Sequence, residues 1–176
     1  WDTEIEVATG ETLYVQIDLQ VVSPWVGMHA PDIYCSDIDG NSHSLSENWG
    51  KVIYVYYFSY TWGTCTGEDI PNAQLKLLDQ FPNDEIEVWV LNMDDGKEWL
   101  EQYRADPNQH HISENLDMPI MYDADSAFES HQVGWQWNSY PPCYLIIDQN
   151  GIVVSRQNYI NVDTAAEVIG GLLSGD

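Results

Sequence analysis

The sequence predicts a single α/β domain in which helices cover a central sheet of parallel and antiparallel strands. Two apolar runs, Val52–Phe58 and Ile86–Leu91, are typical of strands that are buried on both faces. An amphipathic helical pattern over residues 66–81 separates them, and a hairpin followed by a helix ends the chain. This alternation of strands and helices indicates an α/β architecture.

The N-terminal third predicts two hairpins. Residues 4–8 and 12–22 alternate polar and apolar side chains, which is typical of half-buried strands. Asp32–Cys35 and Ser42–Leu45 predict two further short strands around the turn Asp39-Gly40-Asn41. We therefore expect an N-terminal hairpin followed by the first strands of the main sheet.

The middle of the chain alternates helices and strands. In the 66–81 helix the apolar residues recur every 3.6 positions, and Pro82 ends the pattern. Asp95–Arg104 and Ser126–Gln132 predict further helices, and Pro119–Tyr122 predicts a short strand between them.

The C-terminal region predicts a hairpin and a last helix. Strands Tyr144–Asp148 and Ile152–Ser155 flank Asn150-Gly151, a pair of residues that favours tight turns. Asp163 is expected to cap an amphipathic helix that ends near Leu173.

Composition excludes several classes of partner. The chain has 176 residues, 29 acidic and 5 basic, with a formal net charge of −24. A surface of this sign repels nucleic-acid backbones and anionic lipid headgroups, so neither is an expected partner. The longest apolar run is far shorter than the roughly 20 residues of a membrane helix, so we expect no membrane span.

No cofactor or metal is expected. The three cysteines, Cys35, Cys65 and Cys143, are too few and too far apart for a disulfide framework or a zinc knuckle. His110 and His111 are adjacent, so their side chains point apart on a helix or a strand. The chain begins at Trp1 without a leader, from which we expect a processed product that has lost its targeting segment.

Three stretches carry a family resemblance. They are Ala30-Pro31-Asp32 with the following Asp37–Val52 hairpin and strand, Phe58-Ser59-Tyr60-Thr61-Trp62 with Glu68-Asp69-Ile70-Pro71, and Pro142-Cys143-Tyr144-Leu145-Ile146-Ile147-Asp148. In this order they resemble the TlpA/AhpC-type redoxins of the thioredoxin-like superfamily. The resemblance implies a thioredoxin-like three-layer sandwich with a central mixed sheet over residues 30–176, to which residues 1–29 add an N-terminal β-hairpin.

The active-site motif departs from the family. The resemblance places a Cys-x-x-Cys pair at positions 63 and 66, where this chain has Gly63-Thr64-Cys65-Thr66. Tyr57 stands where relatives often hold a carboxylate that accepts a proton. The resemblance therefore implies thiol–disulfide chemistry that is altered or lost.

Two cysteines are the candidate catalytic residues. A thiol at a helix start is stabilised as thiolate, which favours Cys65, although the acidic Glu68 and Asp69 oppose this. Cys143 follows Pro142, which the resemblance implies is a cis-proline beside the active-site turn, and Cys143 is then the candidate resolving thiol. The alternatives are an inert Cys65 on a decayed site and a Cys143 that serves as a small core residue, as we expect of Cys35.

A peroxidase role has weaker support. Cys65-Thr66-Gly67-Glu68 is similar to the Cys-Thr-x-Glu of peroxiredoxins, but Trp62 stands where those enzymes have Thr or Ser. At most a weak thiol peroxidase activity is implied.

The expected partner is a protein thiol, a disulfide or a peptide. Its groove would be formed by Trp62, Gly63, Thr64, Thr66 and Pro142, and Trp135, Trp137 and Tyr140 line this groove or pack in the core. A second hypothesis is a redox-silent binding module that uses the former active-site groove and the N-terminal hairpin. The resemblance also implies an extracytoplasmic location, periplasmic or secreted.

Overall fold

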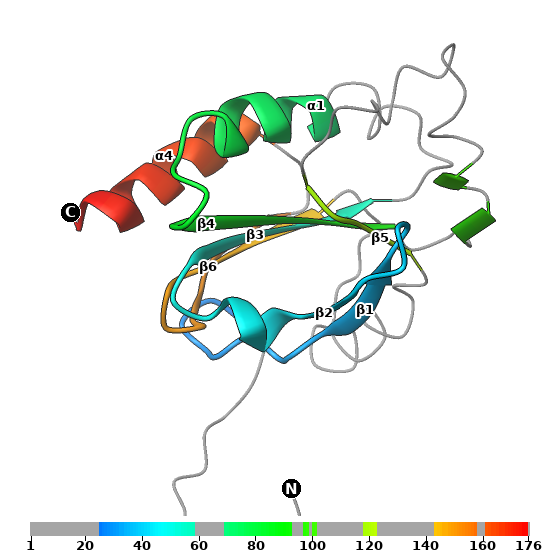
Figure 1. Ribbon diagram of the computed structural model, residues 1–176. Coiled ribbons are helices and arrows are strands. Elements are labelled where there is room, and N and C mark those ends of the chain that lie inside the picture. The colour runs from blue at the N-terminus through cyan, green and yellow to red at the C-terminus, as the bar shows by residue number, and fades with distance from the viewer. Residues whose placement is uncertain are drawn as a thin grey trace, which may run out of the picture.

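The computed structural model describes residues 25–58, 69–92, 97–98, 100–101, 118–122, 143–157 and 161–175. Its centre is a seven-stranded mixed sheet with the order β2-β1-β5-β4-β3-β6-β7 (Figure 1). The strands are β1 (Tyr34–Asp37), β2 (Ser42–Ser44), β3 (Val52–Phe58), β4 (Ile86–Asn92), β5 (Ile120–Tyr122), β6 (Cys143–Ile147) and β7 (Val153–Gln157). The helices are the 3₁₀-helix η1 (Leu45–Asn48), α1 (Ile70–Ala73), the π-helix η3 (Gln74–Leu78) and α4 (Val162–Ser174).

Strand β3 lies in the interior of the sheet, as its sequence predicts. All seven of its residues are buried, because its β-branched and aromatic side chains pack on both faces. It runs parallel to β4 and antiparallel to β6. The mixed α/β sheet expected from the two apolar runs is thereby confirmed.

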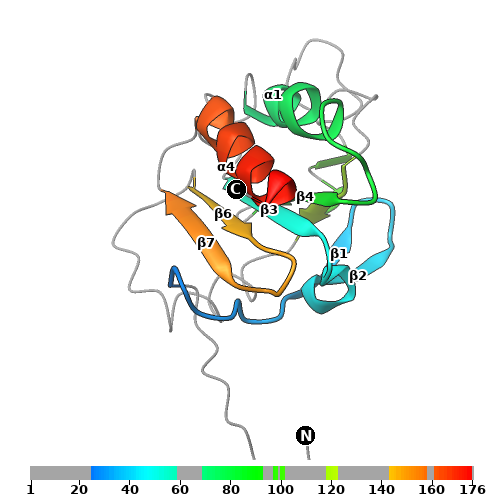
Figure 2. The same cartoon turned by 90° about the vertical axis from the view of Figure 1, so that its left-hand side faces the viewer.

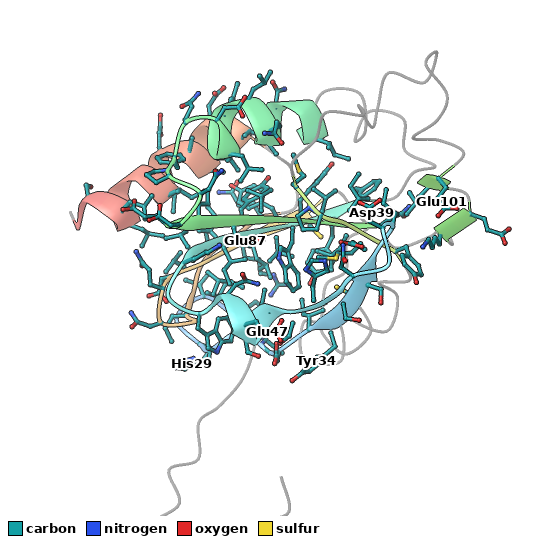
Figure 3. The ribbon with its side chains drawn as sticks, viewed as in Figure 1. His29, Tyr34, Asp39, Glu47, Glu87 and Glu101 are labelled. Carbon is teal, nitrogen blue, oxygen red and sulfur yellow. The ribbon has the colours of Figure 1, made fainter. Side chains whose placement is uncertain are left out.

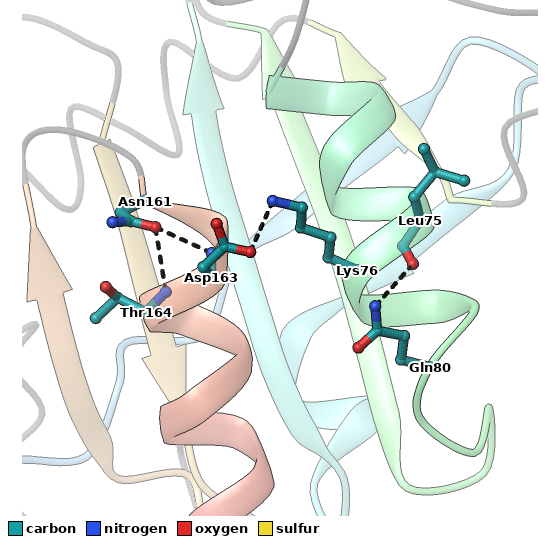
Figure 4. A network of polar contacts seen from close by, with 6 residues as sticks. All are labelled: Leu75, Lys76, Gln80, Asn161, Asp163 and Thr164. Atoms are coloured by element: carbon teal, nitrogen blue, oxygen red, sulfur yellow. Dashed lines mark hydrogen bonds and ion pairs between the residues drawn. The ribbon is translucent and has the colours of Figure 1, made fainter.

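Helices cover one face of this sheet. The helical segment of α1 and η3 and the C-terminal helix α4 pack over the alternate residues Tyr54, Tyr56 and Phe58 of β3 (Figure 1). Lys76 of η3 donates to the Asp163 carboxylate of α4 at 2.7 Å, which joins the two helical segments at the surface (Figure 4). Such an exposed ion pair contributes only modestly to stability.

The other face is covered by the start of the described chain. There Ala30, Ile33 and Leu45 pack against Val55 and Tyr57 of β3. The β1–β2 end of the sheet and η1 lie on this side of β3 (Figure 1). The exposed Tyr34 and Glu47 side chains point away from β3 (Figure 3). The domain thus has two apolar layers, one on each side of β3.

The turn between β1 and β2 is held by one carboxylate. Asp37 accepts hydrogen bonds from the backbone N and the Nδ2 of Asn41 at 2.8 and 2.9 Å, and its Oδ2 lies 2.8 Å from His43 Nε2. Gly40 adopts a φ of 90° in this turn, a conformation that glycine adopts without strain. The hairpin predicted around Asp39-Gly40-Asn41 is confirmed.

Several element ends differ from the prediction. The helical pattern over 66–81 ends at Leu78, and its last five residues form a π-helix in which Asp79 N donates to Gln74 O at 3.0 Å. The final helix is capped by Asn161, whose side chain accepts from the backbone N of Asp163 and Thr164, so the assignment of the cap to Asp163 is wrong (Figure 4). The helix begins two residues earlier than predicted, because Val162 is already helical and buried.

Other predictions fall partly or wholly outside the described residues. Residues 97–98 and 100–101 are helical, as expected for Asp95–Arg104. The N-terminal hairpin and the 126–132 helix lie outside the described part of the chain, as do His110, His111 and the Pro141–Pro142 bond. Among the described residues no helix is long and apolar enough to cross a membrane.

The cap of α4 offers a stability test. Replacement N161A removes the oxygen that accepts from two backbone N–H groups, so the free energy of unfolding should fall by about 1 kcal/mol, measured by urea denaturation. The variant N161D keeps an acceptor at the same position and should retain most of the stability. Equal stability of N161A and the parent protein would contradict the cap.

The Asp37 turn offers a pH test. Burial raises the pKa of Asp37, but the hydrogen bonds from His43 and Asn41 outweigh it, and the pKa lies below its ordinary value. A lowered carboxyl pKa adds stability above the unfolded value of about 3.9, and that stability is lost as the pH falls through the folded value. Replacement D37N should therefore cost about 1–3 kcal/mol at pH 7 and clearly less at pH 3, measured by urea denaturation at both values. A cost that does not change between pH 7 and pH 3 would exclude this role of the Asp37 charge.

Candidate functional site

Most of the predicted site residues lie outside the described part of the chain. These are Trp62, Gly63, Thr64, Cys65, Thr66 and Pro142. The described residues on either side of them are the carboxyl end of β3, Asp69 before α1, and Cys143 at the start of β6. These described residues surround the predicted site in the sequence.

Both ends of the 59–68 segment are attached to the same strand. The segment leaves β3 at Phe58, and it is followed by Asp69, whose Oδ2 accepts from the Tyr56 hydroxyl at 3.3 Å. The described residues on either side of positions 59–68 therefore both belong to or contact β3.

Cys143 lies at this same end of the sheet. It is the first residue of β6, is only 1% exposed, and is paired with Tyr57 across the antiparallel β3–β6 ladder. Directly opposite side chains in such a ladder have their Cβ atoms about 4.5–5.5 Å apart. Both side chains belong to the apolar layer on the side of β1 and β2.

Tyr57 cannot replace the carboxylate that relatives hold at its position. It is completely buried, and burial raises its pKa well above the ordinary value, with further increases from Cys143 and Cys35. The phenol therefore keeps its proton at neutral pH. In this protonated form it does not replace a carboxylate that accepts a proton.

Cys35 has neighbours that are typical of a catalytic nucleophile, but its thiol is held in the protonated form. It faces His43 across the β1–β2 ladder, and His43 contacts the Asp37 carboxylate, so the residue types match a Cys–His–Asp triad. Burial, with the negative charge of Asp37, nevertheless raises the pKa of the Cys35 thiol to about 12. Cys35 forms no disulfide, and the structural role expected of it agrees with this protonated state.

The sequence offers Arg104 and Arg156 as possible cationic partners of a cysteine, but it does not indicate which of them lies near Cys143. Arg156 is the register partner of Leu145, which lies on the same face of β6 as Cys143. The Asn150-Gly151 turn was a usable signal, because a hairpin centred on it pairs residue 145 with residue 156.

Within the described ranges, no three His, Cys, Asp or Glu side chains lie close enough together to hold a metal ion.

Comparison with known proteins identifies the family. The Redoxin family model matches residues 25–169. The chain belongs to the Redoxin family. This confirms the resemblance drawn from the three sequence stretches, and the match begins at the first described residue of the structure.

Two bacterial relatives are identical to this chain at about a quarter of the aligned positions. The chain is 25% identical over 147 residues to the thiol-disulfide oxidoreductase ResA of Geobacillus kaustophilus, covering 83% of this chain and 76% of that protein. It is 26% identical over 145 residues to the thioredoxin-like protein YneN of Bacillus subtilis, covering 82% and 78%.

Solved structures show the same fold. The crystal structure of the reduced 2-Cys peroxiredoxin of Plasmodium vivax matches with a TM-score of 0.67 at 20% identity, covering 85% of this chain and 97% of that one. The thioredoxin domain of a thiol-disulfide oxidoreductase from Bacteroides vulgatus matches with a TM-score of 0.61 at 15% identity, covering 84% and 98%. These matches establish a thioredoxin-like α/β fold.

The state of Cys35 is testable by alkylation. With a pKa of about 12, only about one thiol in ten thousand is ionised at pH 8, so iodoacetamide should leave Cys35 unmodified in the folded protein. In urea the same thiol should react fully, as peptide mass spectrometry would measure. Rapid labelling of folded Cys35 at pH 8 would show that its thiol is not held in the protonated form.

Proposed function

We propose that this redoxin-family chain catalyses thiol–disulfide exchange with two distant cysteines, Cys65 as the attacking thiol and Cys143 as the resolving thiol. The observation that carries the proposal is the position of Cys143. It is buried opposite Tyr57, at the end of the sheet where β3 leads into the segment that contains Cys65. The names of the relatives, thiol-disulfide oxidoreductase and thioredoxin-like protein, support the reaction class.

The reaction proceeds in two balanced steps. The Cys65 thiolate attacks a substrate disulfide, forms a mixed disulfide with one substrate sulfur, and releases the other as thiolate. The Cys143 thiolate then attacks the Cys65 sulfur, which forms a Cys65–Cys143 disulfide and releases the first substrate sulfur. Two electrons pass from the two cysteines to the substrate, whose two sulfurs are reduced.

The second step sets a geometric requirement. A disulfide needs Cα atoms within about 7 Å of each other. The contact between Tyr56 and Asp69 supports this approach, because it holds the far end of the Cys65 segment against the strand that pairs with β6.

The substrate we propose is a protein disulfide or a peptide. Trp62, Gly63, Thr64, Thr66 and Pro142 would line its groove, since they precede or follow the two cysteines in sequence. The proposed setting is extracytoplasmic, which the resemblance to TlpA-type redoxins supports and in which protein disulfides form.

A redox-silent binding module is the second candidate. It is favoured by three exposed apolar side chains, Trp25, Val26 and Met28, which are 49%, 58% and 43% exposed. They lie within residues 1–29, for which we propose an appendage with the added N-terminal hairpin, with residues 30–176 forming the domain. In this function the former active-site groove and the hairpin would bind a protein partner without electron transfer.

Disulfide mapping separates the two functions. After incubation with oxidised glutathione, the first function is expected to yield a Cys65–Cys143 disulfide, leaving one free thiol per chain and three after reduction. The variant C143S should instead accumulate a mixed disulfide on Cys65, seen as a mass increase of one glutathione, because no thiol is left to resolve it. The variant C35S is the matched control: it should form the same Cys65–Cys143 disulfide, leaving no free thiol per chain and two after reduction.

Turnover is expected to be low. In an insulin-reduction assay the rate should stay near background, since Gly63 and Thr66 replace the two cysteines of the Cys-x-x-Cys motif. The variant C65S should abolish any residual rate. Three free thiols before and after reduction, with no adduct on C143S, would reject the exchange function and favour the binding module.

A further inference from the structure

Arg156 is placed beside Cys143 by the β6–β7 register. In this antiparallel ladder Leu145 pairs with Arg156, and Cys143 lies two residues before Leu145 on the same strand and the same face. Diagonal neighbours of this kind are about 7–8 Å apart along the backbone, which a long side chain readily spans. The register therefore allows the Arg156 side chain to approach Cys143 from the same face of the sheet.

An aromatic ring holds this guanidinium. Its Cζ lies 4.4 Å from the centroid of the Trp25 ring, a cation–π contact. The residues that follow Trp25 are hydrogen-bonded to β7, which positions the indole. Gly27 N donates to Val153 O at 2.8 Å, and Val153 N donates to Met28 O at 2.9 Å. Figure 2 shows the 25–33 segment running beside β7.

The setting of Arg156 differs from that of the lysines. Of the five basic residues in the chain, all three lysines contact carboxylates, in the pairs Lys51–Glu87, Lys76–Asp163 and Lys97–Glu101. Arg156 has the Trp25 indole among its contacts. Burial lowers the pKa of Arg156 and Cys143 acts in the opposite direction, which is the effect of an anion-forming group at close range.

Other titratable groups face the same apolar layer. Tyr57 of β3 lies directly opposite Cys143. Cys35 of β1 packs against this layer, and Asp37 of β1 is paired with Met121, which belongs to it. Tyr57 and Cys35 are both held in their neutral forms, because burial raises the pKa of each. The Asp37 charge is engaged by His43 and Asn41, so Arg156 is the group whose charge suits a thiolate at Cys143.

From the β6–β7 register and the Trp25 contact, we infer that Arg156 is the cationic partner of Cys143, and that its guanidinium stabilises the Cys143 thiolate. The use of that thiolate as the resolving nucleophile rests on the proposed function. The electrostatic pairing itself requires only the reduced protein. A thiolate is the reactive form of cysteine, so this pairing would supply the reactivity that the missing family cysteines no longer provide.

The test is a pH titration of Cys143 by NMR. In reduced protein labelled with ¹³Cβ-cysteine, the Cys143 resonance is assigned with C143S, and its midpoint should lie below the ordinary thiol value of about 8.5. In R156Q the midpoint should rise by about one pH unit or more, because an opposite charge close to a thiolate has this effect. R156K keeps the charge and should show a smaller rise, as should W25A, which keeps the arginine but removes its support.

Lys76 provides the matched control. The variant K76Q also removes one positive charge, but from the helix-covered face, and should leave the Cys143 midpoint unchanged. Folding of each variant is checked by its ¹H–¹⁵N spectrum, and R156M, which also removes the charge, carries the test if R156Q is unfolded. In that case a midpoint in R156M equal to that of the parent protein overturns the inference.

Two results would overturn the pairing. One is a parent midpoint at or above about 8.5, and the other is a midpoint that R156Q leaves unchanged within about 0.3 pH units. Neither depends on Cys65, so the titration is repeated in C65S with the same expectation. If the Cys65–Cys143 disulfide never forms but the midpoint still depends on Arg156, the proposed function fails while the pairing stands.

Discussion

Strand β3 is buried on both faces, and its pairing with β4 on one edge and β6 on the other determines where the remaining elements can lie. Parallel pairing with β4 requires a crossover, which the α1 and η3 helices supply on one face of the sheet. Antiparallel pairing with β6 sets Tyr57 opposite Cys143. The candidate chemistry therefore depends on a register that the hydrophobic burial of β3 stabilises.

Burial by itself does not decide what a cysteine in this chain does. Cys35 and Cys143 both pack into the apolar layer below β3, where desolvation penalises a thiolate. At Cys35 the nearby charge is the Asp37 carboxylate, which adds to that penalty. At Cys143 the nearby charge is the Arg156 guanidinium, which opposes it. The sign of one neighbouring charge thus separates a structural thiol from a candidate reactive one.

The strongly acidic composition gives this arrangement its significance. With 29 acidic and 5 basic residues, an average surface position has a negative environment, which disfavours thiolates. The segment around Trp25 changes this locally, because its hydrogen bonds to β7 bring an aromatic ring over the single described arginine. The exposed residues Val26 and Met28 belong to the same segment, so one short stretch of chain both supports the charge and presents an apolar surface.

The sequence by itself determined what depends on near neighbours in the chain. The buried runs of β3 and β4, the Asp37–Asn41 turn and the C-terminal hairpin are local patterns, and the structure confirms them. The exact helix end is not determined in this way, as the Asn161 cap shows, because polar side chains two residues apart, Asn161 and Asp163, can each accept from the first free N–H groups. Only the tertiary structure decided which distant side chains meet, such as Tyr56 with Asp69 and Trp25 with Arg156, since these contacts arise from strand order and packing and leave no periodic signal in the sequence.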